Sequence, residues 1–308
     1  MTNHNISVIQ YIYGGRVMKN TLIIGSSVVD VIINIMRMPQ SGEDENIISQ
    51  HFSMGGCAFN VSQAMKYQHV PYTLFSPIGT GFYGRYVKNY FTRHHLPILI
   101  ESDKRNGCCY CFVDQMGERS FVCEHGAEYF FKKEWFEKLD QNYDQVYICG
   151  LEIEEESGNV IINYLRKHPQ TQVYFAPGPR ICSIPIEKMK KIFKMRPILH
   201  LNLSEILAYT RQEKLEDALN MMHKLNKNII IVTLGENGSL YFDGHQTIYE
   251  PAVETDLMDT VGAGDSHIGT ILAMQAQDKS WSETLQEANR VAAIVVSQRG
   301  ANLKMEDE

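Results

Sequence analysis

Short apolar runs alternate with stretches of helical spacing along most of the chain. The runs, of three to five residues each, cover residues 22–25, 73–76, 146–149, 173–175, 198–201 and 229–233. Their length and apolar content predict buried strands. Apolar positions three and four residues apart predict helices over residues 58–67, 84–95, 158–168, 215–225, 265–275 and 282–297. Strands that alternate with helices predict an α/β fold, with a parallel sheet covered on both faces.

Two regions break this alternation and predict pairs of antiparallel strands. They cover residues 31–51 and 106–124. In the second region, Gln115, Met116 and Gly117 separate two strand-like runs, which indicates a hairpin turn. We expect the two regions to form one small antiparallel sheet beside the main sheet.

The two ends of the chain lie outside this pattern. Residues 1–17 have no basic start followed by an apolar core, so they do not predict a signal peptide. Met18 stands just before the first buried strand, and Gly14, Gly15 and Arg16 are what a translated purine-rich ribosome-binding site would encode. We expect an appendage over residues 1–18, one domain over residues 19–303 and a tail over residues 304–308, and our hypothesis is that the native chain begins at Met18.

Composition and charge narrow the class of protein. The chain has 308 residues, 44% of them hydrophobic and 21% charged, which is typical of a globular protein. It has 36 acidic and 29 basic residues, and the net charge of −7 disfavours non-specific binding to nucleic acid. The longest apolar stretch, residues 22–36, is interrupted by Ser26, Ser27, Asp30 and Asn34, and it is shorter than the roughly 18 residues that span a bilayer. We expect a cytoplasmic protein that binds neither nucleic acid nor a membrane.

The cysteines give no sign of a metal site. There are seven, and Cys108, Cys109 and Cys111 lie close together, but no C-x-x-C pair occurs anywhere. Structural zinc sites need paired ligands at such spacings. We expect reduced and mostly buried thiols.

The strongest chemical signal is the sequence Asp-Thr-Val-Gly-Ala-Gly-Asp-Ser at residues 259–266. Its two glycines, Gly262 and Gly264, let the backbone approach a ligand closely. The sequence runs into an apolar helix, whose N-terminus adds free N–H groups and a partial positive charge. This combination predicts a site for an anion such as phosphate.

Asp265 has two interpretations in this position. As a helix cap, it would only bind free N–H groups of the first turn. As a base beside a transferred phosphoryl group, it would accept a hydroxyl proton, which a carboxylate of ordinary pKa can do because the transition state is loose. The segment is not a Walker A loop, and it is not a dinucleotide fingerprint because His267 occupies the position of the third glycine.

The octapeptide as a whole resembles the C-terminal signature of the ribokinase-like, PfkB-type carbohydrate kinases, and the resemblance extends from Lys19 to Leu303. It implies a three-layer α/β sandwich with a mainly parallel central sheet and a small antiparallel β lid. It implies that Asp265 is the catalytic base and that Gly262, Ala263 and Gly264 form an anion hole. It also implies that Thr260 and Asp259 support the phosphates and the metal-bound waters.

The resemblance also implies an acceptor site in the N-terminal half. Gly55, Gly56 and Asn60 are similar to the family's G-G-x-x-x-N signature, in which paired glycines let a polyol lie against the backbone. The Asn60 amide offers a donor and an acceptor to hydroxyl groups. Asp30 follows the first strand, where the family places an aspartate that binds sugar hydroxyls, although a turn residue would also explain it. Glu152 is a further candidate sugar ligand.

Metal and nucleotide residues are implied after the later strands. Asn202 and Glu205 look like the family's N-x-x-E motif, which organises Mg²⁺ through water beside the phosphates of ATP. A helix start with Ser204 as its N-cap would explain the same segment. The expected nucleotide-binding residues are Thr233, Gly235, Gly238, Thr260, Asn289 and Gly300.

Three departures from the family pattern leave the identity of the acceptor substrate open. His267 stands where the family usually has Phe, and Gly81 stands where it usually has Asp. Both Asp and Asn are missing from the D-x-N-x-R stretch that ends at Arg180. An antiparallel sheet with one bare face is marginally stable alone, and lids of this family often pair, so the resemblance implies a homodimer formed through the lid.

The leading hypothesis is a kinase that transfers the γ-phosphoryl group of ATP to a hydroxymethyl group of a sugar or sugar derivative. A nucleoside kinase, including a pseudouridine kinase, shares the fold, and Phe59, Tyr110 and Phe112 are candidates for an aromatic floor under a nucleobase. The alternative outside this class is a non-catalytic sugar-binding regulator, against which the intact 259–265 segment argues. The missing fingerprint disfavours a dinucleotide oxidoreductase.

Overall fold

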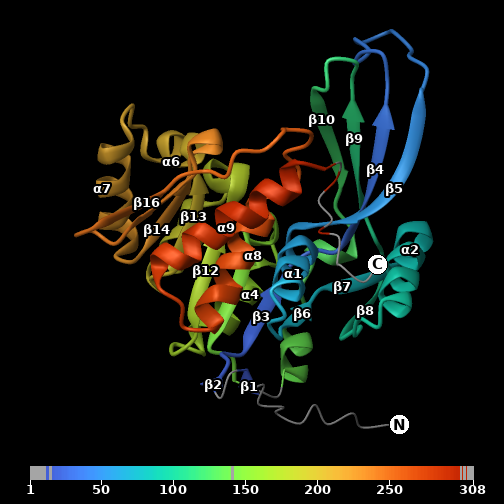
Figure 1. Ribbon diagram of the computed structural model, residues 1–308. Helices are drawn as coiled ribbons and strands as arrows, with labels where there is room; N and C mark the ends of the chain where they lie inside the picture. Colours follow the sequence, from blue (N-terminus) through green and yellow to red (C-terminus); the bar gives the residue numbers. More distant parts are fainter. Residues whose placement is uncertain (1–11, 14–15, 140–141, 299, 301–302, 304–308) are drawn as a thin grey trace.

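Eight strands form the main sheet of the protein. The computed structural model describes residues 12–13, 16–139, 142–298, 300 and 303 (Figure 1). The strand order is β16-β15-β14-β13-β12-β11-β3-β6, and the strands from β6 to β14 are parallel, whereas β15 and β16 are antiparallel at one edge. The bounds are β3 (Thr21–Ile24), β6 (Thr73–Phe75), β11 (Gln145–Cys149), β12 (Gln172–Ala176), β13 (Ile198–Asn202), β14 (Ile230–Thr233), β15 (Ser239–Phe242) and β16 (Thr247–Glu250). All six expected buried strands are therefore present in the sheet.

Helices cover both faces of this sheet, as Figure 1 shows. Successive residues of a strand point to opposite faces. Ile23 of β3 accordingly packs in the core with α1, α8 and α9, whereas Leu22 and Ile24 pack in the core with α4, α5, α6 and α7. The bounds are α1 (Cys57–Tyr67), α2 (Gly81–Arg93), α3 (Gly150–Glu154), α4 (Gly158–Arg166), α5 (Ile186–Phe193), α6 (Leu203–Thr210), α7 (Leu215–Asn226), α8 (Ala263–Ala276) and α9 (Trp281–Val296).

Short elements complete the connections. The 3₁₀ turns are η1 (Ala127–Tyr129), η2 (Lys133–Lys138), η3 (Gly178–Cys182) and η4 (Gly235–Asn237). Two small strand pairs are β1 (Ile12–Tyr13) with β2 (Arg16–Val17), and β7 (Pro77–Thr80) with β8 (Ile100–Arg105). The expectations for residues 1–11 and for the tail at residues 304–308 lie outside the described residues, and the start at Met18 stays a prediction.

The lid is a four-stranded sheet that rises beside the main sheet (Figure 1). Its strands are β4 (Val28–Asn34), β5 (Ser49–Gly55), β9 (Cys108–Val113) and β10 (Arg119–Glu124), in the order β10-β9-β4-β5. Both expected strand pairs are antiparallel, and a parallel pairing of β4 with β9 joins them. The expected turn is present, because Asp114 Oδ1 accepts the N–H groups of Met116 and Glu118, and Gly117 has φ of 81°. Asp30 lies inside β4, so its interpretation as a turn residue is wrong.

The two faces of the lid differ in character. Val29, Val31 and Ile33 of β4 are buried in a core cluster that also includes Tyr110 and Phe112. The hydroxyl groups of Tyr110 and of Tyr83 on α2 lie 3.0 Å apart, which places this face of the lid against α2. Strand alternation directs Asp30 to the other face, together with the cross-strand pair Cys109 and Cys123. The lid thus presents one apolar face to α2, whereas its other face carries Asp30 among thiols and apolar side chains such as Ile32.

All seven cysteines are free thiols, but fewer are buried than expected. Cys108, Cys111 and Cys149 are buried, Cys57 and Cys109 are half-buried, and Cys123 and Cys182 are exposed. The expectation that most are buried is wrong, since Cys123 lies on lid edge strand β10 and Cys182 lies in the surface turn η3. Cysteine counting cannot tell which face of a strand carries the thiol.

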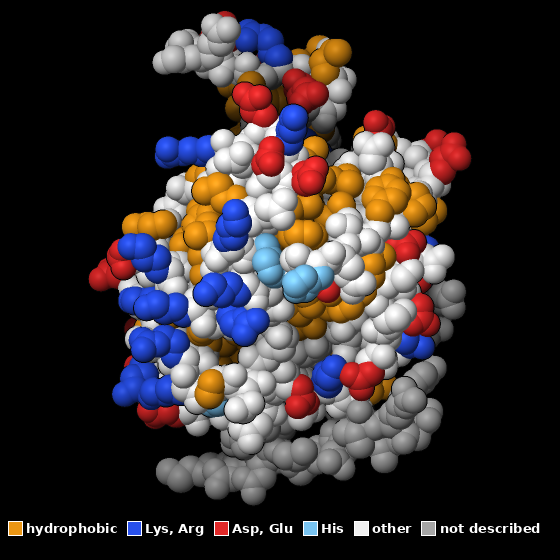
Figure 2. Space-filling view, turned by 90° about the vertical axis from the view of Figure 1, so that its left-hand side faces the viewer, with side chains coloured by type: hydrophobic (Ala, Val, Ile, Leu, Met, Phe, Trp, Pro, Cys, Tyr) orange, Lys and Arg blue, Asp and Glu red, His pale blue; other side chains and the backbone are white. Residues whose placement is uncertain are grey.

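The face beside α6, α7 and β16 shows a separation of side-chain types. Figure 2 shows Lys and Arg side chains gathered along one side of this face, with hydrophobic atoms exposed mainly in its upper half, below the lid. No helix within the described residues is both long enough and apolar enough to cross a membrane.

Candidate active site

Two helix N-termini meet at the carboxyl edge of the main sheet and bring the two strongest motifs together. The Nδ2 group of Asn60, in the first turn of α1, donates a hydrogen bond of 2.9 Å to Asp265 Oδ2, in the first turn of α8. These residues are 205 positions apart in the sequence. Asn60 is buried, and its Oδ1 has no hydrogen-bond partner within the described residues. This oxygen is therefore available to a hydroxyl group of a ligand.

Glycines make this approach possible. A Cβ atom at Gly55 would overlap the Asp30 carboxylate, and one at Gly56, which has φ of 98°, would lie 2.5 Å from the backbone oxygen of Ser26. A Cβ atom at Gly269 of α8 would lie 2.7 Å from Ala64 Cβ of α1, so this glycine lets the two helices pack closely. The G-G pair thus serves the protein's own packing around Asp30.

Burial raises the pKa values of the carboxylates that gather here. Burial raises the pKa of Asp265 to about 6, although hydrogen bonds from Asn60 and Cys57 oppose the shift. Burial also raises the pKa of Asp30 to about 7, and the charges of Cys123 and Asp265 add to this shift. Glu152, which accepts the Ser26 N–H group at 2.8 Å, has a pKa raised by burial to about 7. Such groups are suited to binding hydroxyls and accepting protons near neutral pH.

The N-terminus of α8 is open to an anion. Gly262 is the N-cap residue with φ of 78°, and no side chain caps this helix. Among the described residues, a Cβ atom at Gly264 would meet nothing within 4 Å. Asp265 occupies the first turn without capping it, so the interpretation of Asp265 as a helix cap is wrong. The free N–H groups and the helix dipole can bind a negatively charged group.

Asp259 fixes the loop that precedes this helix. Its Oδ1 accepts the Val261 N–H group at 2.9 Å, and its Oδ2 accepts the Gly300 N–H group at 2.6 Å. Arg119 of lid strand β10 forms an ion pair of 2.7 Å with the same Oδ2 atom. The sequence singled out Asp259 and Gly300 for metal and nucleotide roles, and the structure joins them to each other. Nothing in the sequence pointed to Arg119, since charge patterns within a strand do not reveal a partner in another element.

Asn202 and Glu205 form a capping box at the start of α6. Asn202 Oδ1 accepts the Glu205 N–H group at 2.8 Å, and Glu205 Oε2 accepts the Asn202 N–H group at 2.9 Å. The helix cap is therefore Asn202, and the expectation of Ser204 as N-cap is wrong because the reciprocal bonds select Asn202. Burial raises the pKa of Glu205. Asn202 ends β13 and Glu205 follows it, so their oxygens lie at the same sheet edge as the anion site.

The remaining expected nucleotide residues differ in their surroundings. Thr233 ends β14, Thr260 is exposed, and Gly235 has φ of 60° in the turn that follows β14. Gly238, with φ of 96°, has no room for a Cβ atom, which would overlap the backbone oxygen of Glu250. Asn289 uses its whole amide inside the protein, because Nδ2 donates to the backbone oxygens of Glu250 and Pro251, both at 3.0 Å.

His267 belongs to a buried polar chain beneath the site. Its Nε2 lies 3.1 Å from Asn289 Oδ1, and its Nδ1 lies 2.9 Å from His200 Nε2. Because Asn289 Oδ1 can only accept, His267 donates through Nε2 and accepts at Nδ1 from His200. Burial lowers the pKa of His267 to about 4 and that of His200 well below its ordinary value. The substitution of His for the usual Phe is thus matched by a partner on β13.

The expected aromatic floor for a nucleobase is not assembled. Phe59 is fully buried and stacks on Phe91 in the core, and Tyr110 and Phe112 lie on the face of the lid that packs against α2. The residue types were correctly noted, but strand alternation turns these two rings away from Asp30.

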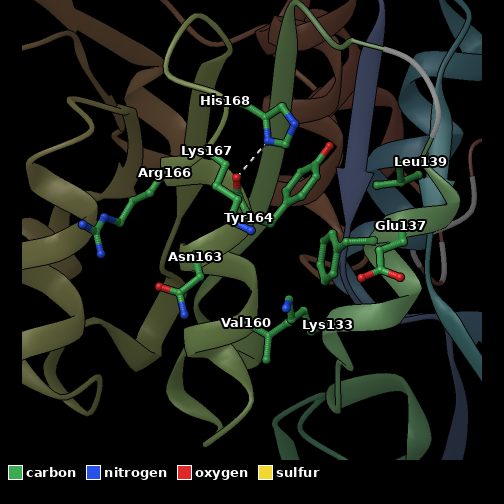
Figure 3. Close-up of a pocket in the computed structure, with 10 residues that line it drawn as sticks. Lys133, Glu137, Leu139, Val160, Asn163, Tyr164, Arg166, Lys167 and His168 are labelled. Atoms are coloured by element: carbon green, nitrogen blue, oxygen red, sulfur yellow. Dashed lines mark hydrogen bonds between the residues drawn. The ribbon is translucent and has the colours of Figure 1, made fainter.

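A separate pocket of about 620 Å³ lies between η2 and α4 (Figure 3). Tyr164 and His168 lie side by side in it, and the His168 ring binds the backbone oxygen of Tyr164 at 2.8 Å. Tyr164 is in the last turn of α4, and His168 follows the helix shortly before β12 begins, so the pocket lies at the amino edge of the sheet. It contains none of the expected site residues. The pocket is lined by Lys133, Phe136, Glu137, Leu139, Val160, Asn163, Tyr164, Arg166, Lys167 and His168.

Comparison with known proteins agrees with this arrangement. The model of the pfkB family carbohydrate kinases matches residues 18–308. The chain belongs to this family. The kinase is 28% identical over 290 residues to YegV, an uncharacterized sugar kinase of Escherichia coli, a match that covers 92% of this chain and 90% of that protein. The expected resemblance is confirmed, and the protein is a phosphotransferase that acts on an alcohol group.

Solved structures confirm the fold expected from the sequence. Ribokinase of Thermotoga maritima superposes on this kinase with a TM-score of 0.79 at 22% identity, over 92% of this chain and 94% of that one. Ribokinase of Arabidopsis thaliana, solved with ribose and ATP, has a TM-score of 0.74 at 20% identity, with the same coverage. The α/β sandwich with its lid is therefore the ribokinase architecture.

The buried histidine pair predicts how stability depends on pH. Both histidines are neutral in the folded kinase, whereas in the unfolded chain they take up protons near pH 6.5. The contribution of this neutral pair to stability is therefore fully present above pH 6.5 and is lost as the pH drops toward 4. At pH 5.0, the shift of His267 alone accounts for about 2 kcal/mol. Between pH 7.5 and pH 5.0, the unfolding free energy measured with denaturant should fall less in His200→Leu/His267→Phe than in the parent. The difference should be at least about 2 kcal/mol.

The control for losing an imidazole is His245→Gln at an exposed position. It should keep the pH dependence of the parent protein. An equal fall in unfolding free energy for the double variant and the parent would contradict the assignment of this dependence to the buried pair.

Proposed function

We propose that this kinase transfers the γ-phosphoryl group of ATP to a hydroxymethyl group of a sugar or sugar derivative. Asp265 is the base, and Gly262, Ala263 and Gly264 form the anion hole. Asp30, Gly55, Gly56 and Asn60 bind the acceptor. The proposal rests chiefly on the hydrogen bond between Asn60 and Asp265, because it joins the candidate acceptor site to the candidate base.

The contacts suggest how the reaction proceeds. A hydroxyl group held by Asp30 and by the free Oδ1 of Asn60 would lie beside the Asp265 carboxylate, which Asn60 orients. Asp265, whose pKa is about 6, is mostly ionised at pH 7 and can accept the hydroxyl proton as the phosphoryl group is transferred. The N–H groups at the start of α8 stabilise the negative charge on the phosphoryl oxygens. The lid covers the acceptor and excludes water.

The proposed substrates agree with what similar proteins act on. The relatives include a deoxyribokinase of Salmonella typhi, and the ribokinase structure from Arabidopsis thaliana holds ribose and ATP. A nucleoside kinase of Methanocaldococcus jannaschii shares the fold with a TM-score of 0.76. We favour a sugar over a nucleoside here, since the rings that might have received a base lie in the core or against α2.

We propose Mg²⁺ as the metal, held through water by Asn202 and Glu205. Within the described residues, no group of three or more His, Cys, Asp and Glu side chains could hold a metal ion directly. An amide and a carboxylate at the phosphate end of the sheet nevertheless fit an ion that prefers oxygen and keeps several waters. Bound Mg²⁺ would neutralise charge on the phosphates of ATP. Thr233, Gly235 and Gly238 would line the nucleotide, with Thr260 and Gly300 nearby, and Asn289 would support that wall through its backbone contacts.

Two substitutions should separate the base from the acceptor site. Asp265→Asn should lower kcat by about 10²–10⁴-fold, because no base accepts the proton, with little change in the KM for ATP. Asp30→Ala should instead raise the KM for the acceptor far more than the KM for ATP, because hydroxyl groups lose a buried partner. A screen of ADP release over sugars and nucleosides identifies the acceptor, and steady-state kinetics then measure both effects.

The same kinetics can refute these assignments. Near-parental kcat in a well-folded Asp265→Asn protein would reject the base. A higher KM for ATP in Asp30→Ala, with the acceptor KM unchanged, would mean that the two ends of the site are exchanged. Loss of activity below about pH 6 in the parent would be consistent with protonation of Asp265, since only its ionised form can accept a proton.

The metal assignment is tested by titration. Turnover should require Mg²⁺ or Mn²⁺ and stop with EDTA. Glu205→Gln should raise the Mg²⁺ concentration that gives half-maximal rate at saturating ATP, because one negative charge near the cation is lost. The choice of sugar should not change. Superimposable titrations of Glu205→Gln and the parent would leave Glu205 only its capping role.

We also propose a homodimer formed through the lid. Within the part of the chain that the structure describes, β5 and β10 are the edge strands of the lid sheet. Ile47, Ile48, Phe121 and Val122 are each more than half exposed. Apolar side chains at a sheet edge favour association. Sedimentation should detect a dimer of the parent, and Val122→Glu should dissociate it. A monomer at all concentrations of the parent would refute the proposal.

A further inference from the structure

Arg119 forms a contact between the lid and the loop of the anion hole that no sequence motif announces. Its guanidinium lies 2.7 Å from Asp259 Oδ2. The Asp259 side chain is 1% exposed and that of Arg119 is 19% exposed, so solvent screens this pair poorly. Asp259 and Met258 are in turn bound through their N–H groups to the backbone oxygen of Val296, at the end of α9. The ion pair thus ends on a firmly held part of the body.

The same carboxylate sets the shape of the anion-hole loop. Asp259 Oδ1 accepts from Val261, the residue before the N-cap Gly262, and Oδ2 accepts from Gly300. An unpaired carboxylate buried to this extent is costly, and two N–H groups do not neutralise its charge. Arg119 supplies that positive charge. Without Arg119, the carboxylate would move toward solvent, and the hydrogen bonds that it accepts from the N–H groups of the loop would be weakened.

Arg119 lies on the face of the lid that also carries Asp30. On β10, Arg119 and Cys123 are four residues apart and point to the same face, and Cys123 pairs with Cys109, which pairs with Asp30. At about 3.3 Å per residue, Arg119 lies roughly 13 Å along the lid from the level of Asp30. The lid therefore approaches the start of α8 at two separated points, through Asp30 near Asp265 and through Arg119 at Asp259.

We propose that Arg119 is a positioning residue that seats the lid on the anion-hole loop and so fixes the acceptor relative to the phosphoryl group. The inference rests on the proposed function, because Asp30 holds the acceptor on the lid while Asp265 and the anion hole belong to the body. The apolar face of the lid packs against α2, and the ion pair of Arg119 adds a contact on the opposite face. Contacts on both faces restrict rotation of the lid more than packing on one face alone. A misplacement of about 1 Å between reacting groups can cost 10²-fold in rate.

The test compares Arg119→Ala, Arg119→Lys and a matched control. Arg119→Ala should lower kcat for the acceptor by about 10- to 100-fold, while the KM for ATP changes little. The ratio of ATP hydrolysis to phosphoryl transfer should rise, because a poorly seated lid admits water. Arg119→Lys keeps the charge and should restore most of the transfer. Ser120→Ala, the next residue on the opposite face of β10, should behave like the parent.

A double-mutant cycle shows whether Arg119 acts through Asp259. Asp259→Asn should reproduce the changed hydrolysis ratio, and adding it to Arg119→Ala should lower kcat no further than the worse single variant. The proposal would be overturned if the two substitutions lowered kcat multiplicatively. It would also be overturned if Arg119→Ala had parental kinetics or left the hydrolysis ratio unchanged. If Arg119→Ala is inert while Asp265→Asn is inactive, this inference fails and the proposed function stands. An active Asp265→Asn protein would reject the assigned base instead.

Discussion

The candidate site depends on the close approach of α1 and α8 at the carboxyl edge of the sheet. The hydrogen bond between Asn60 and Asp265 forms only if both helices begin at nearly the same place. Gly269 lets the helices pack together, and Gly56 lets the chain turn tightly into α1 beneath the lid. A Cβ atom at Gly269 would push α1 and α8 apart, and one at Gly56 would overlap the backbone of Ser26. Residues that look like a flexible loop in the sequence are therefore steric requirements of the site.

Burial at this meeting point also controls its charge. Burial raises the pKa values of Asp30 and Asp265, and the charge of Asp265 adds to the upward shift of Asp30. Beneath them, the neutral side chains of His200, His267 and Asn289 are joined by hydrogen bonds in the interior. The site thus combines acidic groups that can change protonation near neutral pH with a support that stays uncharged.

The lid completes the site from a separate sheet. Its apolar face packs against α2, and this packing determines that Asp30 faces the start of α8. The pocket between η2 and α4 lies at the other edge of the main sheet, and it shares no residue with this arrangement. Parallel strands gather their carboxyl ends at one edge, which is why the chemically useful side chains collect there.

The sequence by itself determined the six parallel strands of the main sheet, six of the nine helices within the described residues, the family and the candidate phosphate-binding motif, because each is encoded by residues that are neighbours in the chain. The octapeptide and the G-G-x-x-x-N segment indicated which side chains belong to the candidate site. The alternation of strands with helices along the chain predicted a sheet with two covered faces. The cap of α6 was assigned to Ser204 instead of Asn202 because reciprocal bonds depend on geometry within one turn. Tyr110 and Phe112 were misjudged because the face that a lid strand buries depends on α2, far away in the sequence. Only the tertiary structure decided that His200 pairs with His267 and that Arg119 reaches Asp259, since partners in different elements meet through packing that no local pattern records.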